Sequence, residues 1–492
     1  MNDKRFGLPL LVTLSLCCFL PAARAQVADW GQIVIPPLPA FHPQEPRRFV
    51  LSNGMVIFLE EDHELPLTRG TARIRGGSRE EPAAKVGLVS IYGEVWRTGG
   101  TKTRTGDELD DYLEAHAARV ETGGGIDSTT ITLDCLKGNL DEVFKVFVEL
   151  LQEPEFREDK LPLAKNQLNT GIARRNDDPG GIASREATKL GYGADSPYAR
   201  QPEYSTVAAV TRDDLLNWHR TYVHPNNIIF GVVGDFDSAA MEQKLRATFE
   251  SWPKGPAPKP LELRFHGPKP GMYFVQKDDV NQSNIRMVEL GTQRDNPDYY
   301  AITVFNEIFG GSFSSRLIED VRTKKGLAYS VGGGVGTAYD HPGLFRISMG
   351  TKSGTTAAAI EALNEEIDGL KPKPPTEEEL KKAKDSILNS FVFEYDSKGK
   401  VLQARMNYEF YAYPADFLER YRAGIEKVTL EDVQRVAQKY VHKDQLAVLV
   451  VGKAADFDKP LSTFGPVANV DIAIPPPPET AKAATSANSE AR

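Results

Sequence analysis

The stretch that decides the fold, residues 210–234, reads VTRDDLLNWHRTYVHPNNIIFGVVG, and a related stretch, VTLEDVQRVAQKYVHKDQLAVLVVG, occupies residues 428–452. The two align without a gap at an offset of 218 positions, as from Thr211 to Thr429. In each copy a threonine, followed three residues later by an aspartate, predicts a helix N-cap. The apolar run before each Val-Gly pair predicts a buried strand. The chain therefore contains two copies of one α/β unit.

The remainder of the 492-residue chain divides around this repeat. Proline-rich stretches predict stiff, extended segments, and the Ala/Ser/Thr/Glu-rich end predicts disorder. The predicted segments are, in order, a signal peptide at 1–25, a Pro-rich arm at 26–47, an N-terminal domain at 48–252, a linker at 253–270, a C-terminal domain at 271–457 and a disordered tail at 458–492.

The first 25 residues are typical of a secretory signal peptide. Lys4 and Arg5 precede a short apolar core, and a small-residue cleavage site ends at Ala25. We therefore expect an exported protein, periplasmic or secreted. No later segment has the 18 or so unbroken apolar residues of a membrane span, and removing the leader keeps one cysteine, Cys135, which excludes an intramolecular disulfide. The net charge of −9 argues against nucleic acid as a partner.

Residues 87–101, GLVSIYGEVWRTGGT, predict a helix that runs into a glycine turn. Together with the duplication, the Asn53-Gly54 hairpin signal and the turn at Gly77-Ser78-Arg79, this helix resembles the pitrilysin/insulinase-like metallopeptidases, in particular the two-domain members such as mitochondrial processing peptidase. The resemblance covers roughly residues 48–455. It implies two homologous α/β (α+β) domains, each a mixed, mostly antiparallel sheet packed with helices, which together form half of a clamshell.

The family's zinc helix carries an inverted H-x-x-E-H motif, in which two histidines bind the metal and the glutamate acts on the attacking water. The matching positions here are Ser90, Gly93 and Glu94. The resemblance also implies a third, acidic ligand, and the helix register places Gly171 at that position. The eight histidines form no H-x-x-H or H-x-x-x-H pair. We therefore expect no metal ligand and no catalytic residue in this chain.

Gly93 lies inside the predicted helix, where glycine costs about 0.8–1 kcal/mol relative to alanine. Its small size could let another backbone approach closely. The simpler interpretation, which we favour from the sequence, is drift after catalysis was lost.

The second half keeps a different feature of the family. The string FGGSFSSRL at 309–317 leads to Arg322 and Tyr329, which are seven residues apart and match an Arg/Tyr pair that the resemblance places across the chamber from zinc. A guanidinium and a phenol can both donate to a peptide carbonyl. Gly332 and Gly333 follow in a strand-like stretch and fit a strand edge that a substrate backbone approaches.

The resemblance then implies a function. We expect a non-catalytic, substrate-binding subunit of a heteromeric zinc endopeptidase that acts on peptides or unfolded polypeptides. A homologous partner would carry H-x-x-E-H and the zinc, so this chain alone would not be an enzyme. Two alternatives stay open: a structural or peptide-binding scaffold of the same fold, for instance a homodimer, and a peptidase with a non-standard site.

Overall fold

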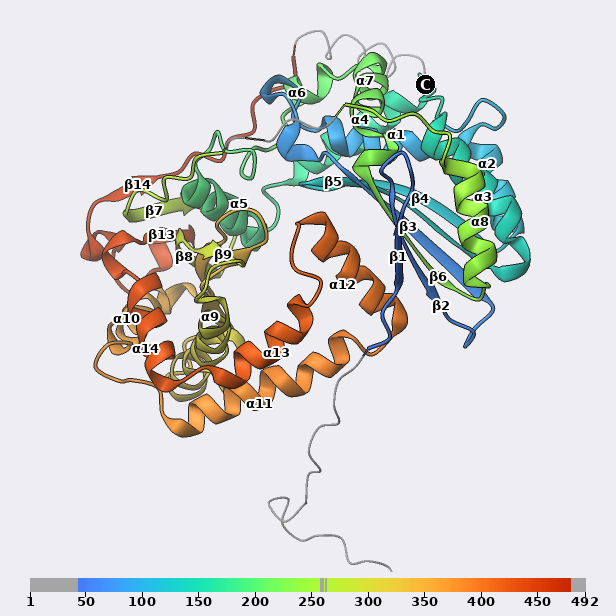
Figure 1. Cartoon of the computed structure of the whole chain (residues 1–492). Helices are drawn as coiled ribbons and strands as arrows, with labels where there is room; N and C mark the ends of the chain where they lie inside the picture. The colour runs from blue at the N-terminus through green and yellow to red at the C-terminus, as the bar shows by residue number, and fades with distance from the viewer. Residues whose placement is uncertain (1–42, 257–260, 262, 479–492) are drawn as a thin grey trace, which may run out of the picture. The chain divides into compact units, whose positions relative to one another are not determined.

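The computed structural model describes residues 43–256, 261 and 263–478. The predicted signal peptide and most of the predicted arm lie outside the described residues, as do parts of the linker (257–260 and 262) and of the tail (479–492). The described chain has an α/β fold built on two six-stranded mixed sheets, each packed with helices (Figure 1). A two-stranded sheet, β9 (Thr292–Gln293) with β11 (Thr337–Ala338), accompanies the second.

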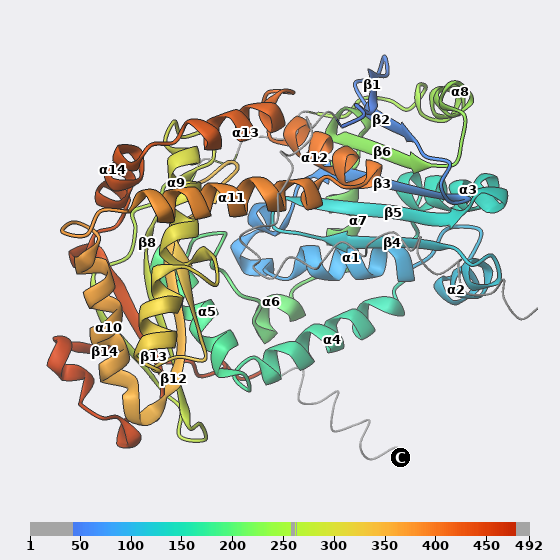
Figure 2. The same cartoon turned by 90° about the horizontal axis from the view of Figure 1, so that it is seen from below.

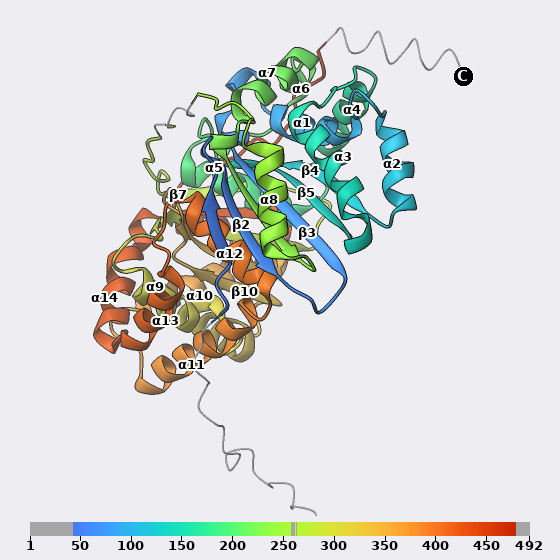
Figure 3. The same ribbon diagram turned by 45° about the vertical axis from the view of Figure 1, so that its right-hand side comes forward.

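The first sheet has the strand order β1-β2-β6-β3-β5-β4, in which only the β2–β6 pair is parallel. Helix α8 crosses one face of this sheet (Figure 3), and Phe147, Phe230 and Phe249 pack between the strands and helices there. The elements of this half are β1 (Arg47–Val50), β2 (Val56–Glu61), β3 (Leu67–Arg75), α1 (Leu88–Thr98), α2 (Gly106–Ala115), β4 (Arg119–Gly124), β5 (Ser128–Leu136), α3 (Leu140–Gln152), α4 (Lys160–Arg174), α5 (Pro179–Tyr192), α6 (Tyr204–Ala208), α7 (Arg212–Tyr222), β6 (Ile228–Gly234) and α8 (Ser238–Phe249).

The second sheet has the order β10-β12-β8-β13-β7-β14, with β13, β7 and β14 parallel to one another. Its remaining elements are β7 (Gly271–Gln276), β8 (Gln282–Leu290), α9 (Tyr299–Asn306), a π-helical turn at Glu307–Gly311, a π-helical segment at Leu317–Lys324, β10 (Ser330–Gly334), β12 (Leu344–Lys352), α10 (Thr356–Gly369), α11 (Glu377–Glu394), α12 (Lys398–Phe410), α13 (Phe417–Lys427), α14 (Leu430–Tyr440), β13 (Ala447–Gly452) and β14 (Val467–Asn469).

The internal repeat is confirmed by the elements that it forms. Thr211 caps α7 in a capping box with Asp214, and Thr429 caps α14 in the same way with Asp432. Each helix leads to a central strand, β6 in the first sheet and β13 in the second. The predicted hairpin at Asn53-Gly54 also forms, since β1 pairs with β2.

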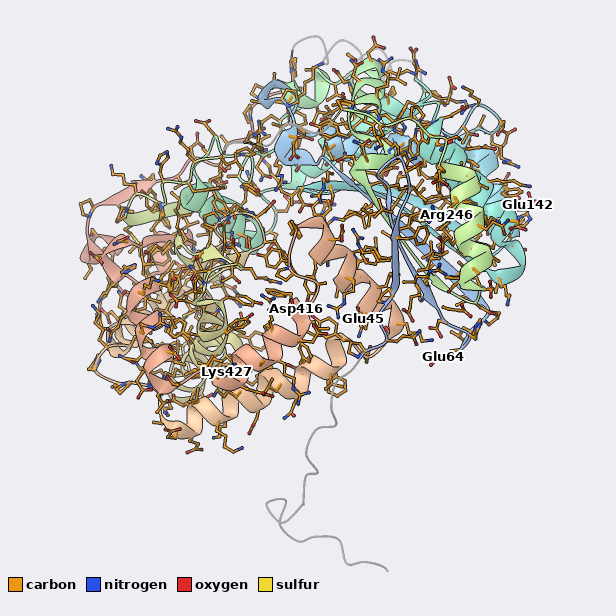
Figure 4. The ribbon with its side chains drawn as sticks, viewed as in Figure 1. Glu45, Glu64, Glu142, Arg246, Asp416 and Lys427 are labelled. Atoms are coloured by element: carbon orange, nitrogen blue, oxygen red, sulfur yellow. The ribbon has the colours of Figure 1, made fainter. Side chains whose placement is uncertain are left out.

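Two helices pack on the sheet of the other half. The apolar face of α5 packs on the second sheet, where Ile182 and Ala187 contact Val288 and Leu449. In the repeat-equivalent place, α12 packs on the first sheet, where Met406 and Phe410 contact Ile229 and its neighbours. Arg405 of α12 also pairs with Glu45. Glu45 precedes β1 and is labelled in Figure 4. The two copies are therefore interlocked by a reciprocal exchange of helices.

The expectation of disorder from residue 458 onward is wrong for residues 458–478. Strand β14 adds to the edge of the second sheet beside β7, and the Val470 N–H continues the ladder by donating to Phe274 O at 2.8 Å. Ile472 then packs beside α5. Val470, Ile472 and Ile474 recur at every second position and carried this strand signal, and the prolines that follow obscured it.

Candidate functional site

Helix α1, which the resemblance aligns with the family's zinc helix, is fixed by hydrogen bonds at its start and by buried side chains along its length. Gly87 begins it with a φ of +103°, and the Glu81 carboxylate accepts from the Gly87 and Val89 N–H groups at 3.1 and 2.6 Å. The α1 side chains Tyr92 and Trp96 are fully buried, and the Trp96 indole donates to Leu150 O at 2.7 Å. Glu81 thus satisfies N–H groups at the helix start that have no partner within the helix.

The resemblance aligns three positions on α1 with the metal-ligand motif, and within the described residues they belong to no cluster that could hold a metal ion. Ser90 and Glu94 are exposed. Gly93 is buried against β4, since a Cβ placed on it would lie 2.6 Å from Gly124 N and 2.8 Å from Gly123 C. The Thr122 hydroxyl also donates to Gly93 O at 2.6 Å. The favoured interpretation of Gly93 as drift is therefore wrong: the close approach of two backbones requires it.

The position of the third ligand is equally unsuited to zinc. Helix α4 lies beside α1 (Figure 2), and Leu168 approaches Gly87 at the point of contact. Gly171 is exposed, with open space around its Cα. Within the described residues, no group of three His, Cys, Asp or Glu side chains is arranged to hold a metal ion. The residues present do not fit the family's zinc.

His219 of α7 belongs to the core under α1. Its Nδ1 lies 2.9 Å from the Tyr92 hydroxyl, and its ring packs against Trp96 and Phe156. Burial lowers the pKa of His219 to about 3. This histidine is thus a neutral, structural residue at physiological pH.

The environment of His219 makes stability depend on pH. Between the unfolded pKa near 6.5 and the folded pKa near 3, the unfolded chain binds a proton that the folded chain does not, so the free energy of unfolding falls as the pH falls. The contribution is at most about 1.4 kcal/mol per pH unit. The variant His219→Gln should show a flatter dependence from about pH 6 to 4 in urea unfolding. Parallel curves for the two proteins would contradict this assignment.

Arg322 and Tyr329 are brought together beside β10. Arg322 lies in the π-helical segment Leu317–Lys324, and its guanidinium carbon is 5.9 Å from the centroid of the Tyr329 ring. The turn between them is fixed where the Leu327 N–H donates to Val321 O and the Thr351 hydroxyl donates to Leu327 O. Tyr329 is 87% exposed and Arg322 is half-buried, so the phenol and part of the guanidinium face solvent. No hydrogen bond, ion pair or ring contact within the described chain joins this pair to the α1 positions.

The glycines of β10 have a packing role of their own. The strand is the last in its sheet, as the expectation of a strand edge requires. A Cβ on Gly333 would lie 2.5 Å from Arg346 O, and a Cβ on Gly310 would lie 2.5 Å from Gly333 N. Gly332 and Gly333 therefore accommodate the chain's own neighbouring segments, and a role in binding a peptide remains a prediction.

A hollow of about 450 Å³ lies beside β10 and was not foreseen from the sequence. Its floor is formed by residues of three strands, β8, β12 and β10. Two arginines, Arg286 and Arg346, line it. They are 60 positions apart on neighbouring strands, so only the pairing of β8 with β12 could have revealed them.

Both halves of the chain match models of known protein families. Residues 58–187 match the model described as insulinase, peptidase family M16, and residues 209–387 match the model described as the peptidase M16 inactive domain.

Among the described residues, no helix is both long enough and apolar enough to cross a membrane.

Two relatives have sequences similar to most of this chain. A Bacillus subtilis protein named as the uncharacterized zinc protease YmxG is 25% identical, covering 82% of this chain and 98% of its own. A Helicobacter pylori protein named as the non-peptidase homolog YmxG is 23% identical, covering 80% and 91%.

Solved structures show the same fold. A peptidase M16 inactive domain from Pseudomonas fluorescens superposes with a TM-score of 0.75 at 24% identity, covering 83% of this chain and 98% of that one. A Helicobacter pylori protease superposes with a TM-score of 0.72 at 20% identity, covering 83% and 100%. The two matched models, the internal duplication and the relatives of full length agree, and the chain belongs to the insulinase-like M16 peptidase family.

Proposed function

We propose that this chain is the non-catalytic, peptide-binding subunit of an exported zinc endopeptidase made of two homologous chains. One observation carries the proposal: α1 has Ser90, Gly93 and Glu94 in place of the zinc motif, and the backbone of β4 fills the space beside Gly93. The partner would supply the zinc and the H-x-x-E-H motif. This chain would supply part of the wall that holds the peptide.

The half-buried Arg322 and the exposed Tyr329 support the peptide-binding part of the proposal. Neither side chain takes part in a hydrogen bond or an ion pair within the described residues, and the two lie within cation–π distance of each other. Guanidinium and phenol groups donate to carbonyl oxygens, and they would also stabilise the negative charge that develops on a carbonyl under attack. The name of the Helicobacter pylori relative, a non-peptidase homolog, agrees with a member of this family that does not cleave peptides itself.

The proposal is tested by reconstitution. Mixing the full chain with an H-x-x-E-H-bearing family member from the same organism should give zinc-dependent cleavage of an unfolded polypeptide such as reduced casein. Arg322→Ala and Tyr329→Phe should each lower turnover about tenfold, because each removes one charge-stabilising donor. Turnover is measured under saturating partner concentration.

The matched control is Arg420→Ala on α13, which removes an exposed arginine paired with Asp416 and should leave turnover unchanged. Equal turnover in all variants would contradict the role of the pair. A mixture that assembles without gaining activity would favour the scaffold instead.

A further inference from the structure

We propose that the hollow beside β10 binds a carboxylate carried by an extended peptide, either an acidic side chain or a free C-terminus. The inference rests on the proposed function, because it names the chemistry of the peptide that the chain would bind. It assigns Arg286 and Arg346 as the two residues that recognise the carboxylate.

Strand register places these groups on one surface. Arg286 of β8 lies opposite Ser348 of β12, which in turn lies opposite Gly332 of β10. Arg346 lies two residues before Ser348, on the same face of β12, because side chains alternate along a strand. The two guanidinium groups therefore project from neighbouring strands into the same hollow.

The two arginines use few of their hydrogen-bond donors within the described chain. Neither forms an ion pair with any carboxylate of the described residues. Arg346 Nη2 donates to the Thr188 hydroxyl at 3.0 Å, and Arg286 Nη1 donates to Ile285 O at 3.0 Å. Each guanidinium has five N–H donors, so most of them have no acceptor in the described chain.

Asp178 is the acidic residue whose charge acts on Arg286. It already accepts hydrogen bonds at the start of α5. Its carboxylate accepts from the Gly180 and Gly181 N–H groups at 3.0 and 2.7 Å, as the N-cap of α5. Burial and the neighbouring Arg346 lower the pKa of Arg286, and Asp178 offsets this only in part. Two cations held this close repel each other, and a carboxylate between them would form charge-assisted, bidentate hydrogen bonds with both.

The floor of the hollow leaves these donors accessible. Gly350 of β12 lines the hollow without a side chain, and a Cβ placed on it would come no closer than 3.7 Å to Ser330 Oγ. A peptide backbone can therefore lie close to the sheet at this point. An extended peptide directs every second side chain toward such a floor. The chain as a whole has a net charge of −9, so this cationic hollow is a local exception that would draw anionic groups to one place.

The test measures binding of three degenerate pools of fluorescein-labelled dodecapeptides to the full chain by fluorescence anisotropy. One pool has fixed glutamates at two central positions and an amidated C-terminus. The second has glutamines there and an amidated C-terminus, and the third has glutamines and a free C-terminal carboxylate. We expect one carboxylate-bearing pool to bind about tenfold more tightly than the amidated glutamine pool, as charge-assisted hydrogen bonds predict. Which of the two it is identifies the source of the carboxylate.

The double variant Arg286→Ala/Arg346→Ala should reduce this preference to less than about twofold. Arg346→Ala alone removes an exposed side chain, so it should fold normally and lose part of the preference. Arg420→Ala makes the same change of charge elsewhere and should keep the preference in full. Binding of all three pools with equal affinity, or a preference that survives in the double variant, would overturn the inference while leaving peptide binding intact. Failure of every pool to bind would overturn both proposals.

Discussion

Replacing Gly93 with glutamate is expected to lower the free energy of unfolding by about 3 kcal/mol or more, although glutamate is the residue that the resemblance implies at this position. The new side chain would begin at a Cβ only 2.6 Å from Gly124 N and 2.8 Å from Gly123 C. Backbone atoms of a paired strand cannot move aside as a flexible side chain can. Either α1 or β4 must shift, which disturbs the core around Tyr92 and Trp96. Urea unfolding of the full chain measures the loss.

The smaller substitution Gly93→Ala distinguishes close packing from drift by whether it raises or lowers the free energy of unfolding. If Gly93 were an accident of drift, Gly93→Ala would stabilise the helix by about 0.8–1 kcal/mol. Because the space is filled, we expect Gly93→Ala to destabilise the protein by about 1–3 kcal/mol instead.

Two controls isolate this effect, one on the neighbouring helix α4 and one on α1 itself. Gly171→Ala on α4 meets nothing within 4 Å of its Cβ and should stabilise the protein by about 0.5–1 kcal/mol. Ser90→His on α1 is exposed and should change stability by less than about 0.5 kcal/mol. A stabilising Gly93→Ala would contradict the packing argument and with it the observation on which the proposed function depends.

The features that local sequence could predict are those whose physical cause is local. Thr211 and Thr429 mark helix starts because a hydroxyl caps the N–H three residues later, and both caps form. The repeat of cap, helix and buried strand correctly indicated two related sheets, because each copy has its own apolar strand to bury. The spacing of Arg322 and Tyr329 likewise brought two side chains together across a short turn.

What the sequence could not show depends on contacts between distant segments. The apolar faces of α5 and α12 indicate that each helix packs on something, and nothing local indicates that each packs on the sheet of the other half. The need for glycine at position 93 arises from β4, about 30 residues later. Arg286 and Arg346 look like ordinary strand residues in the sequence, because only the pairing of β8 with β12 brings them to the same surface.

The second large loss of stability is expected where the exchanged helix α12 packs on the first sheet. Arg73 of β3 donates to Asn407 Oδ1 at 2.6 Å and to the Tyr411 hydroxyl at 3.1 Å, and its guanidinium carbon lies 3.6 Å from the centroid of the Phe410 ring. It also pairs with Asp127 at 3.2 Å, and the two side chains are only 12% and 11% exposed. Arg73→Met should lower the free energy of unfolding by about 3–5 kcal/mol, because it leaves the Asp127 carboxylate buried without its cation.

The strand itself provides the control. Arg69 lies four residues earlier on β3 and pairs with Asp134, but both side chains are largely exposed, at 61% and 45%. Arg69→Met should therefore cost no more than about 1 kcal/mol. Adding Asp127→Asn to Arg73→Met should recover part of the loss, since the unpaired buried charge is then removed. Equal losses at positions 69 and 73, or no recovery in the double variant, would show that the buried pair is not what holds α12 on the first sheet.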